Sequence, residues 1–274
     1  MFQKIVTHAG AAHRDDLLSC CFALALHPEI NSVERRDPTP DEIADPDVLV
    51  LDVGGVYDAP SSDFDHHQFA RGTEPRCAMS LYLEFEGLLP AFKLQDWWEP
   101  TIRMDATGPF QTAGWLGVKP EAILQLESPL ERAIVGLFET STILSSGDLS
   151  SLRLLGKAVL DKVLGFAKKL EELQLLTVVI EIRGVKALKF NTKDTEATQK
   201  FRDSRHPDAA ISVALDDRGP GLALYRFNDH ERVDFSKVKG DPAVLFSHPG
   251  GFIAKTKGII EGEALVNLLS AAIK

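Results

Sequence analysis

The sequence predicts a two-domain α/β protein, with a parallel sheet in the N-terminal domain and a mixed α+β sheet in a smaller C-terminal domain. Three observations support this fold class. Strand and helix patterns alternate near the N-terminus, a long helical pattern covers Leu149–Leu176, and short β-type runs follow it. The 274 residues are enough for two domains, and we place them at 1–148 and 177–274, with a connecting helix at 149–176.

The N-terminal elements follow from the residue pattern. Gln3–Thr7 and Asp47–Val53 are apolar and β-prone, and each predicts a buried strand. Between them Leu17–His27 is apolar almost all round, as expected of a helix packed on a sheet. Asp15 and Asp16 lie just before this helix, where acidic residues suit the helix dipole. The strand–helix–strand order indicates parallel pairing.

The remaining elements are predicted in the same way. Ala78–Glu86 has helical spacing, and the segment from Leu94 to Ser146 mixes helical stretches with Pro and Gly breaks. In Leu149–Leu176, apolar residues repeat every three or four positions. We expect strands at Thr177–Ile182, Ala187–Asn191, Ala209–Leu215 and Gly221–Phe227, a hairpin turn at Asp216–Gly221 and a closing helix at Glu261–Lys274.

Composition limits the functions that we consider. Forty acidic and thirty basic residues give a net charge of −10, which argues against a protein that grips long nucleic acid non-specifically. A small phosphorylated substrate or a short oligonucleotide remains compatible. The three cysteines form no CxxC pair, so no zinc clip or disulfide framework is predicted. Neither a signal peptide nor a membrane-spanning run is evident, and we expect a cytoplasmic protein without a membrane partner.

Four polar clusters stand out against this background. The first, His8–Asp16, follows the first predicted strand, and the second, Asp52–Gly55, follows the next strand. The third is Asp63–Gln68 and the fourth is Met104–Gly108. Because ligand sites in open α/β sheets lie outside the carboxyl ends of the strands, we expect the first two clusters to converge.

The residue types in these clusters favour a metal site. Imidazoles and carboxylates together suit manganese better than calcium or a thiolate-seeking ion. Two ions need about six protein ligands with a shared carboxylate, and such a pair can activate water in phosphoryl transfer. Each residue alone has an ordinary structural explanation, but four of the eight histidines fall in two short clusters. The predicted ligands are His8, His13, Asp15, Asp52, His66 and Asp105.

These clusters resemble the motifs of the DHH phosphoesterase superfamily, and most closely those of its Myg-type branch. Thr7–Asp16 matches the opening pattern T-H-x-G-x-x-H-x-D-[DE] of that branch, and Asp52–Asp58 and Phe64–Gln68 also follow it. Ser247–Phe252 is similar to its H-x-[SG]-G-F segment. The chain departs from the branch at Ala12, where a bulky residue is usual, and after Asp105, where many relatives have Asp-Asn-Gly.

The resemblance implies an N-terminal DHH catalytic domain and a C-terminal substrate-binding domain, with the active-site cleft between them. It implies two Mn²⁺ ions, with Mg²⁺ or Co²⁺ as alternatives, and a bridging role for Asp52. Asp65 would orient a neighbouring histidine, and His67 would contact the scissile phosphate or protonate the leaving oxygen. The implied substrate-binding residues are Arg71, His248, Gly250, Gly251 and Lys255.

Several functions remain open at this point. The first is a metal-dependent phosphodiesterase or exonuclease acting on nucleotides or short oligonucleotides, because relatives in the branch are associated with 3′–5′ exonuclease activity on RNA. The others are a pyrophosphatase, polyphosphatase or nucleotide phosphatase, a non-catalytic binding module, and a mononuclear zinc hydrolase. A base-stacking aromatic near His248 would favour the first, and a small all-basic pocket would favour the second. The oligomeric state also stays open, with a homodimer as one option.

Overall fold

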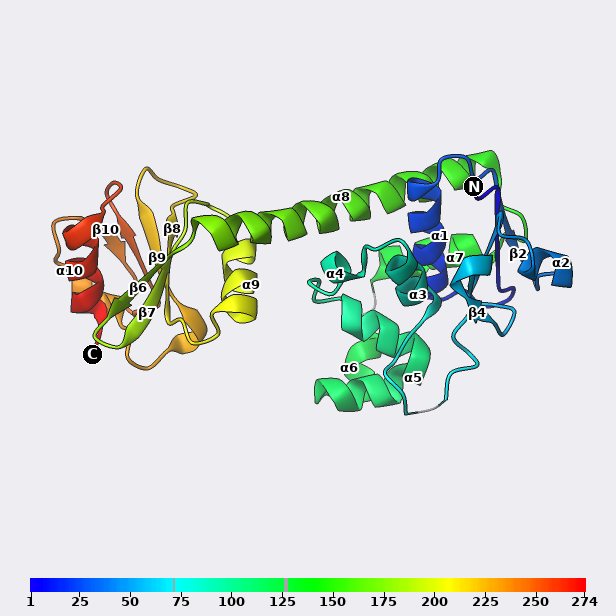
Figure 1. Cartoon of the computed structure of the whole chain (residues 1–274). Helices are drawn as coiled ribbons and strands as arrows, with labels where there is room; N and C mark the ends of the chain where they lie inside the picture. The colour runs from blue at the N-terminus through cyan, green and yellow to red at the C-terminus, as the bar shows by residue number, and fades with distance from the viewer. Residues whose placement is uncertain (71, 126–127) are drawn as a thin grey trace. The chain divides into compact units, whose positions relative to one another are not determined.

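The computed structural model describes residues 1–70, 72–125 and 128–274, and it divides into two compact units, residues 1–165 and 166–274 (Figure 1). Each unit has its own sheet and its own apolar core. The domain boundaries and the cleft that we expect from the sequence stay predictions.

The first unit contains a mostly parallel sheet, as predicted. Its strands are β1 (Lys4–Thr7), β2 (Ser32–Arg35), β3 (Val48–Leu51), β4 (Tyr57–Asp58) and β5 (Asp63–Phe64), in the order β2-β1-β3-β5-β4. Only β4 pairs antiparallel, with β5. We did not predict β2, which carries the adjacent charged residues Glu34 and Arg35, or β4 and β5, which are too short to show a period.

The helices of this unit build its main apolar core with one face of the sheet. The helices of this unit are α1 (Arg14–Leu26), α2 (Pro40–Ile43), α3 (Ala78–Phe85), α4 (Leu89–Phe92), α5 (Trp98–Leu116), α6 (Pro120–Gln125), α7 (Pro129–Glu139) and the first part of α8 (Ser146–Leu176), with a 3-10 turn η1 (Ala59–Ser61). α1 begins at Arg14, so Asp15 and Asp16 lie inside its first turn. From the sequence, we had expected these two residues just before the helix. Cys20 and Cys21 are buried in the core, in keeping with their apolar surroundings in the sequence.

α8 crosses α1 at very short range, and a glycine makes this crossing feasible. A Cβ atom placed on Gly156 would lie 1.9 Å from the carbonyl oxygen of Cys21 and 3.2 Å from the Cβ of Ala25. Leu152 and Leu160 of α8 belong to the same core as the buried residues of α1. The long helix is therefore fixed to the first unit by backbone-to-backbone packing at one position.

Gly156→Ala is expected to lower the free energy of unfolding by about 1–3 kcal/mol, because the added methyl group has no room beside the Cys21 carbonyl. Gly165→Ala is the matched control in the same helix, since a Cβ there meets nothing within 4 Å. That control should keep or raise stability, because alanine is the better helix former by about 1 kcal/mol. Denaturant unfolding of both variants tests this, and equal effects would contradict the packing argument.

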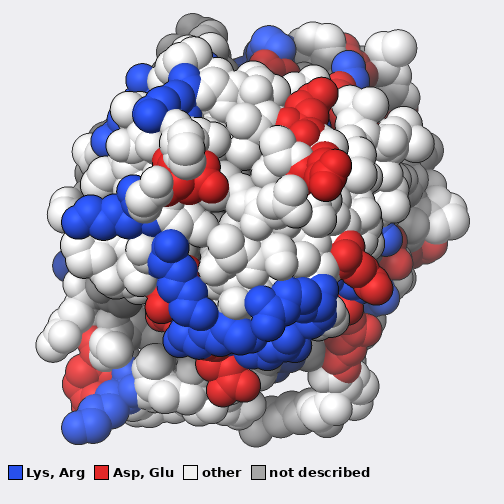
Figure 2. Space-filling view, turned by 90° about the vertical axis from the view of Figure 1, so that its left-hand side faces the viewer, with Lys and Arg blue, Asp and Glu red and all other residues white. Residues whose placement is uncertain are grey.

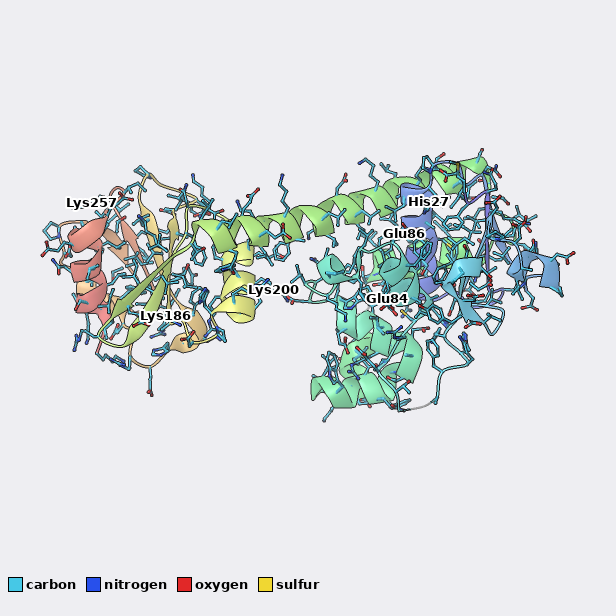
Figure 3. The ribbon with its side chains drawn as sticks, in the orientation of Figure 1. His27, Glu84, Glu86, Lys186, Lys200 and Lys257 are labelled. Atoms are coloured by element: carbon cyan, nitrogen blue, oxygen red, sulfur yellow. The ribbon has the colours of Figure 1, made fainter. Side chains whose placement is uncertain are left out.

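The carboxyl ends of α1 and α3 are joined by one polar contact. His27 caps α1 and Glu86 caps α3, and the His27 Nε2 atom lies 2.9 Å from Oε1 of Glu86 (Figure 3). The hydrogen bond to Glu86 is the main cause that raises the pKa of His27 above its ordinary value. A pKa that is raised by folding means that the pair stabilises the protein fully below the unfolded pKa of about 6.5. The stabilisation is then lost as the pH rises through the folded pKa.

Glu86→Gln is therefore expected to cost about 1 kcal/mol of stability at pH 6 and less at pH 9, because His27 is charged only at the lower pH. Unfolding in urea at the two pH values measures the difference. Glu84→Gln is the control, since Glu84 pairs with Arg76, whose charge does not change in this range (Figure 3). A cost of Glu86→Gln that is the same at both pH values would refute the role of the pair.

The second unit contains the predicted mixed sheet. Its strands are β6 (Val178–Ile182), β7 (Val185–Lys189), β8 (Ile211–Leu215), β9 (Leu222–Arg226), β10 (Val244–Ser247) and β11 (Ile253–Thr256), in the order β10-β11-β9-β8-β7-β6. β7 and β8 pair parallel because α9 (Thr195–Arg205) crosses between them, and the other pairs are antiparallel. The hairpin predicted at Asp216–Gly221 joins β8 to β9.

The two faces of this sheet carry different helices. α10 (Gly262–Ala272) packs on one face with its leucines against Val213, Leu224 and Ala254, and α9 lies on the other face (Figure 1). We had not predicted α9, because TEATQKFRDSR is polar and only Ala197, Thr198 and Phe201 of the helix are buried. Two 3-10 turns, η2 (Phe227–Asp229) and η3 (Phe235–Val238), connect β9 to β10.

Basic side chains gather at the carboxyl end of α10. Arg183 donates to the carbonyl oxygens of Ser270 and Ile273, and Arg232 donates to the carbonyl oxygen of Arg183. Figure 2 views the α10 side of this unit and shows Lys and Arg side chains in one curved group beside a broad uncharged surface. Cations at this end complement the helix dipole, so the two arginines have a structural role.

Candidate metal centre

The His8–Asp16 loop joins β1 to α1 and is shaped by helix capping. His13 is the N-cap residue of α1, and its backbone N–H donates to Oδ1 of Asp16 at 2.9 Å. Gly10 has a φ of +80°, which a residue with a side chain rarely adopts. His8 leaves the carboxyl end of β1, and its Nδ1 atom lies 2.9 Å from the carbonyl oxygen of Ala9. That contact turns Nε2 of His8 toward the sheet edge.

Asp52 follows β3 at the same edge. β1 and β3 are parallel neighbours with Thr7 opposite Leu51, so the next residues, His8 and Asp52, emerge side by side. The Nε2 atom of His8 lies 3.4 Å from Oδ2 of Asp52. Asp52 has a φ of +60°, in the left-handed region, and it is buried. A non-glycine residue in this conformation costs about 1–3 kcal/mol, and such residues cluster at functional sites.

The third and fourth clusters complete the group. β5 pairs with β3, and His66 follows β5 so that its Nε2 atom lies 3.1 Å from Oδ1 of Asp52. The same Nε2 atom is 2.8 Å from Oδ2 of Asp105. Asp105 lies within α5, three residues before Gly108, where φ is +78° and the helix kinks. Asp105 therefore sits on a helix.

The structure thus brings all six predicted ligands to one place. Three subsets have ligand atoms within 4.8 Å of one another and could each hold a metal ion. These subsets are His8 with His13 and Asp52, Asp52 with His66 and His67, and His13 with Asp15, Asp52 and Asp105. Asp52 is the one member that all three share, as a bridging carboxylate would be.

Several polar atoms of this cluster are buried without hydrogen-bond partners among the described residues. They are both carboxylate oxygens of Asp15, Nε2 of His66, Oδ1 of Asp52 and Oδ2 of Asp105. Several contacts among these atoms are short, but they are not aligned as hydrogen bonds. Buried polar groups in proteins nearly always have partners, so an unpartnered set needs an explanation. Lone pairs that converge on one point, at one sheet edge, fit a cation there.

The charges within the cluster act strongly on one another. Burial raises the pKa of Asp15 well above its ordinary range, and the carboxylates of Asp105 and Asp52 raise it further. Burial also raises the pKa of Asp52. Burial acts to lower the pKa of His66, but Asp105 and Asp52 outweigh it and raise this pKa to about 10. A divalent cation would relieve this concentration of negative charge.

Asp65 and His67 form a pair beside the cluster. Oδ1 of Asp65 lies 2.6 Å from Nδ1 of His67 and accepts the His67 backbone N–H at 3.0 Å. Oδ2 of Asp65 accepts the Gly55 N–H at 2.6 Å. Burial acts to raise the pKa of Asp65, but these donors outweigh it and hold the pKa below its ordinary value. The side chain of His67 is mostly exposed, with Nδ1 4.0 Å from Oδ1 of Asp52.

A cavity of about 400 Å³ opens beside this cluster within the first unit. His13, Asp15 and Asp105 line one part of it, and Arg14 and Arg132 line another. Arg14 is ion-paired with Glu131. The cavity therefore combines predicted metal ligands with Arg14 and Arg132, and Glu131 and Glu139 also line it.

The predicted substrate-binding residues of the C-terminal half lie in the second unit, and nothing places them against the cluster. His248, Gly250 and Gly251 form the turn between β10 and β11, in which the Gly250 N–H donates to Nδ1 of His248. Gly251 has a φ of +69°, and a Cβ on it would meet Oδ1 of Asp234 at 2.2 Å, so this glycine is needed for packing. Lys255 lies on β11, and Arg71 lies outside the described residues.

Sequence reasoning missed two residues that hold the site. Asp16 lies 2.9 Å from Nε2 of His8 and is the main cause that raises the pKa of His8 to about 9. Its position in the opening motif was a signal, but from the sequence we related Asp16 only to the helix dipole. Arg35, 3% exposed, donates to the carbonyl oxygens of Gly10 and Glu139 and so ties the loop to α7. No sequence signal pointed to Arg35, because β2 itself was not predicted.

The neighbours Asp15 and Asp16 should respond to substitution in opposite ways in the metal-free protein. Asp16→Ala is expected to destabilise by about 2 kcal/mol, because the N–H groups of His13 and Leu17 lose their shared acceptor. Asp15→Ala removes a buried carboxylate without hydrogen-bond partners, so stability should stay the same or rise. Thermal unfolding with EDTA compares the two variants, and a larger loss for Asp15→Ala would contradict the assignment.

Fold and site together define an α/β protein with a His–Asp cluster at the carboxyl edge of a mostly parallel sheet. Residues 4–77 match the family described as "Uncharacterised protein family (UPF0160)". The chain is 42% identical over 66 residues to "MYG1 exonuclease" of Homo sapiens and 38% identical over 65 residues to that of Mus musculus. These matches support the Myg-type family for the N-terminal segment.

The matched region is a small part of this chain and of its relatives. It covers 24% of this chain and 17% of the human or mouse protein, so the chain spans about a sixth of their length in the match. Three clusters of the site, from His8 to His67, fall inside it, and Asp105 does not. Among the described residues, no helix is both long enough and apolar enough to cross a membrane.

Proposed function

We propose that this protein is a divalent-metal-dependent phosphoesterase of the DHH type that hydrolyses phosphodiester bonds in short oligonucleotides. The observation that carries the proposal is the set of converging, buried and unpartnered His and Asp atoms around Asp52. The relatives named exonuclease support a nucleic-acid substrate, since the matched segment contains most of the cluster.

In this proposal His8, His13, Asp15, Asp52, His66 and Asp105 hold two ions, with Mn²⁺ preferred for the mixed imidazole and carboxylate ligands. The bound ions would supply a water activated at neutral pH and would neutralise charge on the phosphoryl oxygens. Asp52 is the shared ligand, and the strained backbone holds its carboxylate at the centre. The contact of His8 Nδ1 with the Ala9 carbonyl fixes which ring nitrogen faces the site.

The remaining groups would act on the substrate. Asp65 orients the His67 ring through Nδ1, so Nε2 of His67 is free to donate to the scissile phosphate or to the leaving oxygen. Arg14 and Arg132 in the adjoining cavity would attract the phosphate backbone. The net charge of −10 limits binding to short substrates, because a long strand would meet an acidic surface.

The test combines hydrolysis with metal binding. With Mn²⁺, wild type is expected to cleave labelled RNA or DNA oligomers and bis-p-nitrophenyl phosphate, and Asp52→Asn should lose about 100-fold or more in rate. Asp58→Asn, an exposed aspartate on β4, is the matched control and should stay active. Calorimetric titration with Mn²⁺ should show weaker binding for Asp52→Asn than for wild type, and unchanged binding for Asp58→Asn.

Other outcomes separate the competing functions. Hydrolysis of pyrophosphate without cleavage of oligomers would replace the phosphodiesterase assignment with that of a pyrophosphatase. If Asp52→Asn binds Mn²⁺ and turns over substrate as wild type does, the metal centre itself is refuted. The absence of both Mn²⁺ binding and turnover in wild type would leave a non-catalytic binding module.

A further inference from the structure

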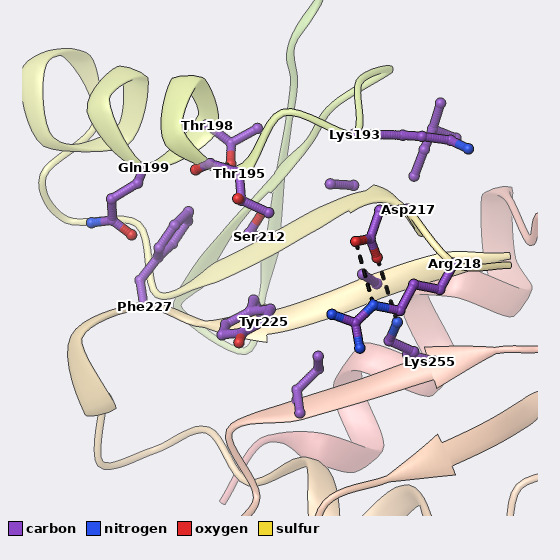
Figure 4. Close-up of a pocket in the computed structure, with 14 residues that line it drawn as sticks. Lys193, Thr195, Thr198, Gln199, Ser212, Asp217, Arg218, Tyr225, Phe227 and Lys255 are labelled. Carbon is purple, nitrogen blue, oxygen red and sulfur yellow. Dashed lines mark hydrogen bonds and ion pairs between the residues drawn. The ribbon is translucent and has the colours of Figure 1, made fainter.

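The second unit contains a cavity of about 440 Å³ on the α9 face of its sheet (Figure 4). It is lined by α9, by β8, β9 and β11, and by the loop between β8 and β9. We propose that this cavity binds one nucleotide unit, with the base on Tyr225 and the phosphate against Lys193 and Arg218. This proposal adds a nucleotide-binding site to the proposed function. The role of the site in substrate choice rests on that function.

The hollow results from small side chains on one face of the sheet. Ala223 on β9 lies opposite Ala214 on β8 and opposite Lys255 on β11. One step along, Tyr225 lies opposite Ser212 and Ile253, on the same face because side chains alternate along a strand. α9 borders this surface with Thr195, Thr198 and Gln199 and leaves the face of β9 and β11 open.

One end of the cavity is basic. Lys193, Arg218 and Lys255 line it, together with a single lining carboxylate, that of Asp217 (Figure 4). Lys255 Nζ lies 2.5 Å from Oδ1 of the buried Asp216 and 3.7 Å from Oδ1 of Asp217. Lys255 therefore neutralises Asp216, and two cations remain against Asp217.

The two remaining cations suit a phosphate. The Arg218 side chain is 84% exposed, and its Nε atom is 3.6 Å from Oδ2 of Asp217, a loose pair that leaves the guanidinium able to turn. Lys193 is exposed and, within the described part of the chain, has no ion-pair partner. An arginine with free N–H groups can hold two phosphate oxygens at once, and the lysine adds charge.

The other end is aromatic. Tyr225 is 42% exposed, although it lies in the floor of a cavity, and the nearly buried Phe227 closes the wall beside it (Figure 4). The ring of Tyr225 also lies 6.2 Å from that of Phe252, whose ring is 4.2 Å from that of His248 and tilted against it. An open aromatic face of this kind is a platform for a base. A base-stacking aromatic near His248 is the feature that, from the sequence, would favour an oligonucleotide substrate over pyrophosphate, and Phe252 lies between Tyr225 and His248.

The spacing of the two ends fits a nucleotide. Tyr225 and Ala223 are two residues apart on β9, and Lys255 is the partner of Ala223 on β11. Two residues of a strand span about 7 Å, which is the scale of the sugar between a base and its phosphate. Pyrophosphate or a bare sugar phosphate would leave the tyrosine without a role.

The test measures binding without the metal centre. The full chain in EDTA is titrated calorimetrically with adenosine 5′-monophosphate, ribose 5-phosphate, adenosine and the dinucleotide pApA. The monophosphate is expected to bind at least about 10-fold more tightly than ribose 5-phosphate or adenosine, because stacking and phosphate contacts add. If it binds no more tightly than these two fragments, the proposal is wrong. Tighter binding of pApA than of the monophosphate would identify the end of an oligonucleotide as the ligand, and the reverse would identify a free nucleotide.

Variants locate the site. Tyr225→Ala should reduce monophosphate affinity to that of ribose 5-phosphate, whereas Tyr225→Phe should keep it, because the ring alone stacks. Arg218→Gln should reduce it to that of adenosine. Lys239→Gln, an exposed lysine outside the cavity, is the control and should bind as wild type. Wild-type affinity in both Tyr225→Ala and Arg218→Gln would overturn the proposal.

Asp52→Asn separates this proposal from the proposed function. In EDTA it should bind the monophosphate as wild type does, since Asp52 lies in the first unit and the cavity lies in the second. Monophosphate binding without any Mn²⁺-dependent hydrolysis by wild type would defeat only the proposed function. Hydrolysis of oligomers by wild type without monophosphate binding would defeat only the nucleotide site.

Discussion

The parallel pairing of β1, β3 and β5 is the constraint on which the first unit depends. Strands that run in the same direction end at the same edge, so the residues after them meet. Here those residues are acids and imidazoles, and burial makes their mutual repulsion and desolvation costly. The fold thus stores an unfavourable electrostatic arrangement at one edge, and a cation is the natural means of relieving it.

Hydrogen bonds and packing around the cluster hold its residues in place despite this cost. Asp16 accepts the backbone N–H groups of His13 and Leu17, and Arg35 ties the Gly10 carbonyl to α7. Asp65 holds the chain after β5 through the Gly55 and His67 N–H groups. Behind the site, the close crossing of α8 over α1 fixes the helix that carries Asp15 and Asp16. The site is therefore rigid in its supports although its central polar atoms lack partners.

The two faces of the sheet in the second unit are covered to different extents. Its sheet buries one face under α10, but α9 covers only part of the opposite face. Small residues at Ala214 and Ala223 then leave a hollow, and the β8–β9 hairpin and the loop before α9 supply charge at its rim. A hollow that is apolar and aromatic at one end and basic at the other has the two chemistries of a nucleotide.

Much of the fold was predictable, and the failures have physical causes. β1, β3, α3, α10 and the β8–β9 hairpin were expected, since their apolar spacing directly reflects burial. β2 and α9 were missed because tertiary contacts, and not their own polar sequences, make them regular. The grouping of the predicted ligands was likewise foreseen from strand ends. The roles of Asp16 and Arg35 were not, because they depend on contacts with distant or unpredicted elements.

The sequence by itself determined which residue types follow each strand, and hence which chemistry one sheet edge can offer. Only the tertiary structure decided that Asp105, on a helix far along the chain, reaches His66, and that Asp52 adopts a left-handed backbone. It also decided that Tyr225, Arg218 and Lys193 border one cavity. The physical reason is that local patterns record burial and backbone preference, whereas distances between side chains are set by how whole elements pack.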